Sequence, residues 1–134
     1  MLRPIAPAKA GEISLDYHMT LEALRRGVAN QYHVGSMAQA ICMAMLLNQR
    51  GYGSALPELF RDAEGVIVRC RQAGLATGIC VVDHDAYALL GQVLTLFDRQ
   101  LAAAPVRDLI AVNAKLKALF SAANGSIEGN DNNA

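Results

Sequence analysis

The feature that most constrains the fold of this chain is a set of five stretches in which apolar residues recur every three or four positions. In the first of them, Tyr17, Leu21, Leu24 and Val28 follow a 4, 3, 4 spacing. An α-helix has 3.6 residues per turn, so this spacing places the side chains on one face that must be buried against another element. Five such faces between residues 17 and 120 predict an all-α, antiparallel bundle of four or five helices.

The other four helices are expected at about residues 32–50, 57–73, 83–103 and 106–120. The second is apolar nearly all round between Ala40 and Leu47, which is typical of the central helix of a bundle. Hydrophobic residues make up 53% of the chain but aromatic residues only 5%, with no Trp. The core must therefore consist mostly of Leu, Ala, Val, Ile and Met, which suit close helix packing better than a sheet surface.

Three segments are expected along the chain. Residues 1–13 contain two Pro and no helical period, so they predict an extended N-terminal arm. Residues 14–121 form the helical-bundle domain, and the small, polar residues 122–134 predict a disordered tail. Within the domain, only "GLATGICVVD" has strand character, and without a second strand signal it predicts an extended connector. Gly74, in this stretch, is the expected stop of the third helix.

Charge and cysteine content exclude several classes of protein. Twelve basic and twelve acidic residues give a formal net charge of zero, so no overall field draws the chain to nucleic acid or to an anionic membrane. The three Cys have no repeated spacing and predict neither a disulfide framework nor a zinc site. The longest apolar run, residues 40–47, is far shorter than the roughly 20 residues that cross a bilayer. We therefore expect a cytoplasmic protein with no membrane contact and no cofactor.

The densest group of chemically active side chains is the run Asp83, His84 and Asp85. Neighbouring positions on a helix point about 100° apart, so these three cannot converge on one ion. They are better explained as the start of a helix. Asp83 is expected to be the N-cap, Asp85 to lie at the positive end of the helix dipole, and His84 to be solvated.

No other group in the sequence predicts a catalytic, cofactor or metal site. His18 and Glu22 have the i, i+4 spacing of half a metal site, but no second such pair occurs. Cys42, Cys70 and Cys80 fall in apolar surroundings, where a thiol is usually a small buried side chain. A metal-dependent enzyme remains a remote alternative.

The helix expected from residue 83 carries two adjacent apolar registers. One can fill the core of the bundle, and the other would then meet another subunit. We expect a non-enzymatic regulator or adaptor that associates with itself, most simply as a dimer, or docks on another protein. The expected interface residues are Ala86, Leu89, Leu90, Val93, Leu96 and Phe97.

A second hypothesis is a helix-turn-helix transcriptional regulator that uses residues 21–39. This segment offers a short helix, a turn at Gly27, and polar side chains at the start of the next helix, although that helix continues into the most apolar part of the chain. The residues that would contact DNA in this hypothesis are Arg25, Arg26, Gln31, Tyr32, His33, Ser36 and Gln39.

Overall fold

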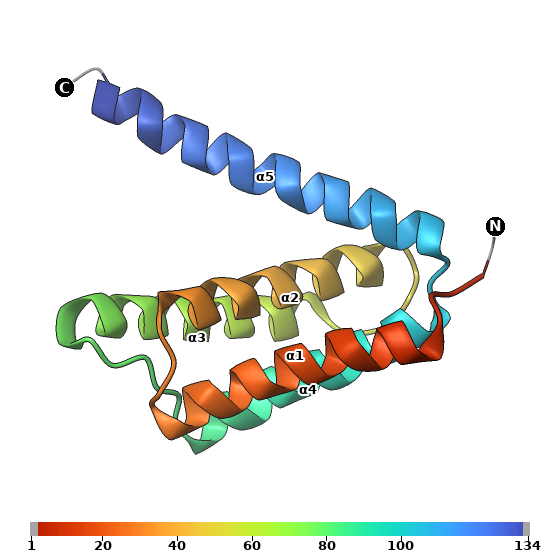
Figure 1. The fold of residues 1–134 in the computed structure, drawn as a ribbon, viewed down its shortest axis with the longest axis horizontal. Coiled ribbons are helices and arrows are strands. Elements are labelled where there is room, and N and C mark those ends of the chain that lie inside the picture. Colours follow the sequence, from red (N-terminus) through yellow and green to blue (C-terminus); the bar gives the residue numbers. More distant parts are fainter. Residues whose placement is uncertain (1–2, 133–134) are drawn as a thin grey trace.

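The protein is an all-α bundle, as its sequence predicts. The structure is a computed structural model that describes the backbone of residues 3–132 and the side chains as far as residue 122. The described chain contains no β-strand, only two isolated β-bridges. Its five helices are α1 (Pro7–Arg26), α2 (Gln31–Gln49), α3 (Pro57–Thr77), α4 (His84–Ala103) and α5 (Val106–Asn132), arranged as in Figure 1.

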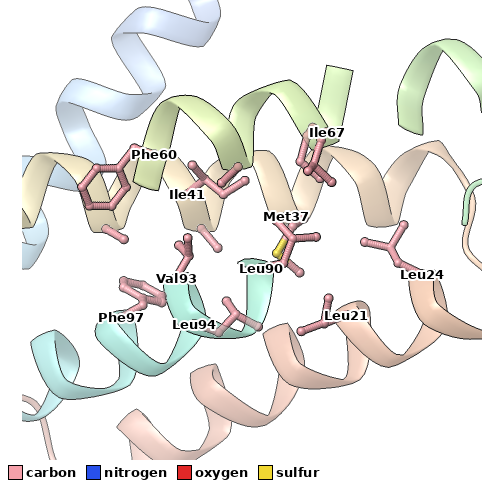
Figure 2. Close-up of a cluster of buried hydrophobic side chains, with 14 of the residues drawn as sticks. Leu21, Leu24, Met37, Ile41, Phe60, Ile67, Leu90, Val93, Leu94 and Phe97 are labelled. Atoms are coloured by element: carbon pink, nitrogen blue, oxygen red, sulfur yellow. The ribbon is translucent and has the colours of Figure 1, made fainter. Parts of the chain in front are cut away.

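Helices α1 to α4 enclose the hydrophobic core. Figure 2 shows side chains from all four helices in this cluster, among them Leu24 of α1, Met37 of α2, Ile67 of α3, and Leu90 and Phe97 of α4. Full burial of each such side chain stabilises the fold by about 1.5–3 kcal/mol. Helix α2 contacts each of the other four helices, which confirms its central position.

Side-chain caps fix where two of these helices begin. The Asn30 side chain accepts a hydrogen bond from the backbone N–H of His33 at 3.3 Å, and the His33 ring accepts one from the backbone N–H of Asn30 at 3.0 Å, which together form a capping box. At the start of α4, the Asp83 carboxylate accepts from the backbone N–H of Ala86 at 2.8 Å. The prediction that Asp83 is an N-cap is confirmed.

The predicted extended connector is confirmed for residues 79–82, which lie close to α3, whereas residues 74–77 of the predicted stretch belong to α3 itself. Cys80 forms an isolated bridge with Ala29. A Cβ on Gly74 would lie only 2.3 Å from the Cys80 sulfur, so only glycine allows the connector to approach this closely. The prediction that Gly74 ends α3 is wrong. The helix continues to Thr77 and ends at Gly78, whose φ of 80° is left-handed.

The N-terminal arm is shorter than predicted. Helix α1 begins at Pro7 rather than near residue 14, because Pro is well suited to the first turn, where its missing N–H leaves no hydrogen bond unmade. Before it, the chain is extended and contacts the α4–α5 junction. The Arg3 carbonyl accepts a hydrogen bond from the backbone N–H of Val106 at 3.0 Å, and Pro4 bridges to Pro105.

Helix α5 packs only along part of its length. Leu109, Val112 and Leu116 are buried, whereas Ile110 is 64% exposed and Phe120 is 37% exposed, so the apolar face predicted for this helix is only partly covered. Figure 1 shows α5 diverging from α2 and α3 towards its C-terminal end. The backbone of α5 runs on to Asn132, through most of the tail predicted as disordered, and residues 133–134 of that tail lie outside the described residues.

Candidate functional site

The interface predicted on α4 is wrong for half of its residues. Leu90 and Val93 are 0% exposed and Phe97 is 2% exposed, because α1, α2 and α3 pack against this part of α4. These side chains belong to the core and cannot meet another subunit. The other three predicted residues, Ala86, Leu89 and Leu96, are half-buried and lie beside surface hollows.

The remaining face of α4 lines a large surface hollow, which we name the α4 cleft. It has a volume of about 980 Å³ and lies between α1, α4 and the loop of residues 51–55. Small side chains, Ala88 and Gly91, leave room along α4, and Leu96 supplies apolar surface. The α4 residues that line the cleft are Tyr87, Ala88, Gly91, Gln92, Thr95, Leu96, Arg99, Gln100 and Ala103.

Gln100 is a buried polar side chain of the α4 cleft, only 1% exposed. Its Nε2 donates a hydrogen bond to the Ala44 carbonyl at 2.9 Å, whereas its Oε1 has no partner among the residues that the structure describes. An unsatisfied buried carbonyl of this kind costs about 1–3 kcal/mol. Sequence reasoning missed this residue, although one signal was available, since Gln100 follows Val93 and Phe97 in the same apolar register.

A polar pair and a group of three polar residues border the α4 cleft. His18 Nε2 lies 2.8 Å from Asp98 Oδ2. Asp108 accepts a hydrogen bond from the Tyr52 hydroxyl and forms an ion pair with Arg50, whose Nη1 lies 3.0 Å from Asp108 Oδ1. The hydrogen bond to Asp108 raises the pKa of Tyr52. These contacts tie the loop of residues 51–55 to α5 and keep one wall of the cleft in place.

The sequence-level candidates for metal binding are not brought together. His18 pairs with Asp98, whereas Glu22 pairs with Arg25 and Arg26. Within the described residues, no three His, Cys, Asp or Glu side chains converge in a way that could hold a metal ion. His84 is exposed, as expected for a residue in the first turn of a helix.

A second hollow lies where α5 diverges, and we name it the α5 groove. Its volume is about 710 Å³, and its apolar walls come from α2, α3 and Phe120. Val68 is 52% exposed and Leu75 is 69% exposed along its α3 wall. Cys42 lies in the α2 wall. Partial burial raises the pKa of its thiol, with a further increase from Glu64 and an opposing decrease from Lys115.

The residues of the helix-turn-helix hypothesis divide into two groups. Arg25 and Arg26 form ion pairs with Glu22. Four residues of the other group line a hollow of about 430 Å³ between α1 and α2, namely Tyr32, His33, Ser36 and Gln39. Gln31 instead lies near the connector, with Nε2 3.6 Å from the Cys80 sulfur.

Helix α2, which would be the recognition helix, buries seven of its residues in the bundle. A recognition helix needs an exposed face that can enter the major groove, and only the first turns of α2 offer one. DNA binding therefore stays a prediction.

Comparisons with protein-family models, with curated proteins and with solved structures find no match to this chain. None of the helices in the described residues is both long and apolar enough to traverse a lipid bilayer.

Proposed function

We propose that this protein is a non-enzymatic cytoplasmic regulator or adaptor that acts as a homodimer, and that two copies associate through the α5 groove. The observation that carries the proposal is the divergence of α5, which leaves apolar side chains exposed on both sides of a groove. An exposed apolar surface around a hollow is the usual mark of a protein interaction site.

The occupant that fits best is a second copy of the chain, because one copy carries both the hollow and the side chains to fill it. Leu119 and Phe120, near the middle of α5, are 50% and 37% exposed. Gly35 and Ala38 in the α2 wall are small, and nothing lies within 4 Å of the point where a Cβ on Gly35 would stand. Two copies related by a two-fold axis can each place Leu119 and Phe120 towards the groove of the other, so the same surface serves on both sides.

The charged groups near the α5 groove also favour a second copy of the chain as its occupant. Glu64 and Lys115 both act on Cys42, so each copy presents a carboxylate and an ammonium group near the groove. In a two-fold pair, the carboxylate of one copy can face the ammonium of the other. The formal net charge of zero means that no overall repulsion opposes association.

Sedimentation equilibrium between about 10 μM and 1 mM tests this function, because it covers the affinities expected of a modest interface. The groove variant carries Val68→Ser and Phe120→Ser. The matched control carries Leu15→Ser and Met19→Ser, which are 59% and 61% exposed on α1 and do not line the groove. All four positions are at least 37% exposed, so both variants should keep the helical circular dichroism of the parent.

We expect the parent and the control to reach the mass of a dimer and the groove variant to remain a monomer. A parent that is monomeric at 1 mM overturns the proposed self-association. A groove variant that dimerises as well as the control does shows that another surface is used and overturns the role of the α5 groove.

A further inference from the structure

We propose that Cys70 of α3 and Cys80 of the connector form a reversible disulfide when the protein meets a small hydroperoxide such as hydrogen peroxide. Both cysteines are free thiols in the structure, and neither lines the α5 groove. The inference therefore stands apart from the proposed dimer, and either can fail without the other. The spacing of the cysteines along the chain does not reveal this pair, because the two residues meet only where the connector packs on α3.

The fold places both sulfur atoms in the small space between α3 and the connector. The Cys70 Sγ lies 3.8 Å from the carbonyl oxygen of Val81, the residue that directly follows Cys80. The Cys80 Sγ lies 2.3 Å from the point where a Cβ on Gly74 would stand, one helical turn beyond Cys70 on the same face of α3. Burial raises the pKa of the Cys70 thiol, and the charge and a hydrogen bond of Cys80 add to the increase, which requires the two thiols to be neighbours.

A disulfide at this place needs little rearrangement of the chain. It joins Cα atoms about 4.4–6.8 Å apart, so its main requirement is that the connector lies close to the α3 backbone. The missing side chain of Gly74 provides that close approach. The connector can also adjust, because Ile79 and Val81 are 53% and 48% exposed and a small shift of the backbone displaces few packed neighbours.

The pair lies where a molecule as small as hydrogen peroxide can approach it. Cys70 is 4% exposed and lines a surface hollow of about 410 Å³ between α3, the connector and α4, and Val81 lines the same hollow. Only a thiolate attacks a peroxide, and the raised pKa keeps most of the Cys70 thiol protonated at neutral pH. The pair should therefore stay reduced until peroxide accumulates.

The oxidation balances in two steps. The Cys70 thiolate attacks one oxygen of the peroxide, so an S–O bond forms, the O–O bond breaks, and a water molecule leaves with the thiol proton. The Cys80 sulfur then attacks the sulfur of the Cys70 sulfenic acid, so the S–S bond forms, the S–O bond breaks, and a second water molecule leaves with the proton of the Cys80 thiol. The two thiols together lose two electrons to the peroxide, and a dithiol reductant reverses the reaction.

Peptide mapping of the full-length protein tests the bond directly. The protein at micromolar concentration is treated with a millimolar excess of hydrogen peroxide, its remaining thiols are blocked with iodoacetamide, and it is digested with trypsin without reduction. Trypsin cleaves after Arg69, Arg71 and Arg99. A bond between the two cysteines therefore joins the peptides 70–71 and 72–99, which mass spectrometry identifies.

Three serine variants are treated in parallel, and Cys42→Ser, which removes the third cysteine, is the matched control. We expect the joined peptides in the parent and in Cys42→Ser, and dithiothreitol should separate them. Cys80→Ser should instead accumulate a sulfenic acid at Cys70 that dimedone traps, because the thiol that would remove it is absent. The oxidised parent should melt about 3–10 °C higher than the reduced parent, because the bond closes a loop in the unfolded chain. Treated Cys70→Ser should show no such rise.

Peroxide that links the parent only through Cys42 overturns the inference. So does peroxide that leaves Cys70 and Cys80 unlinked, whether as thiols or as separate sulfinic acids, while the circular dichroism shows that the protein stays folded. If either Cys70→Ser or Cys80→Ser does not fold, the peptide maps of the parent and of Cys42→Ser still decide the question.

Discussion

The four helices α1 to α4 and the helix α5 have similar apolar patterns but different surroundings. Helix α4 is covered by α1, α2 and α3, so that Leu90 and Val93 are completely buried. Helix α5 rests mainly on α2 and leaves Leu119 half exposed. The comparison shows that a 3.6-residue period predicts a helix face that favours burial, whereas the number of neighbouring helices decides how much of that face is covered.

The way in which α5 is attached explains this difference. Its contacts beyond helix packing gather at its first turn, where Val106 bonds to Arg3 and Asp108 pairs with Arg50. Along the outer half, no comparable ion pair or side-chain hydrogen bond to the rest of the chain is found within the described residues. Helix α5 is therefore anchored to the rest of the chain at its first turn.

The largest expected effect contrasts the core with α5. Leu90→Ala should lower the free energy of unfolding by about 2–5 kcal/mol, because it opens a cavity in a region with no exposed surface. Phe120→Ala should cost less than about 1 kcal/mol, because the ring is already 37% exposed. Urea denaturation at low protein concentration measures both. Equal losses would mean that α5 belongs to the same closed core.

The next largest change in the free energy of unfolding is expected where α3 contacts the connector. Gly74→Ala should lower the free energy of unfolding by about 1–3 kcal/mol, because its Cβ would lie 2.3 Å from the Cys80 sulfur. In Gly11→Ala, the new Cβ meets nothing within 4 Å, and the better helix propensity of Ala should stabilise the protein by about 0.5–1 kcal/mol. Thermal unfolding measures the stability of both variants. If both were more stable than the parent, the connector could not lie as close to Gly74 as the structure places it.

Loss of the cap at the start of α4 should have a smaller effect. Asp83→Ala removes the acceptor for the backbone N–H of Ala86 and should cost about 1 kcal/mol. His84→Ala, at the neighbouring exposed position, should change the stability by less than about 0.5 kcal/mol. A loss well above 2 kcal/mol in urea denaturation of Asp83→Ala would show that this carboxylate does more than cap the helix.

The smallest expected effect is a decline of stability at alkaline pH. Burial raises the pKa of the Cys70 thiol, with a smaller contribution from Cys80, so the folded protein keeps this proton at a pH where the unfolded chain has lost it. The stabilisation from Cys70 is complete below the pKa of the unfolded thiol, about 8.5, and is lost as the pH rises through the folded pKa. Urea denaturation from pH 7 to 10 should show a shallower decline in Cys70→Ala than in the parent. Parallel profiles would contradict this account.

Local signals in the sequence were enough to predict the helical class and several boundaries. The 4, 3, 4 spacing of apolar residues and the cap at Asp83 act within a few residues, so they can be read without the fold. The sequence pattern wrongly predicts a helix end at Gly74. A glycine is needed there because Cys80, on another segment, lies against it, and local sequence does not reveal that contact. Gln100 was missed for the same kind of reason, since its burial depends on α2.

The central contrast in the molecule is between a closed core and an α5 that we propose a second copy covers. Hydrogen exchange of the parent protein at about 10 μM and 1 mM tests this directly, because a partner protects the surface it covers in proportion to its concentration. We predict that the amides of residues 117–122 and of the α2 and α3 walls of the groove gain protection at the higher concentration, while those of residues 90–101 remain equally protected at both. Protection of residues 117–122 that matches α4 and does not change with concentration would contradict the account.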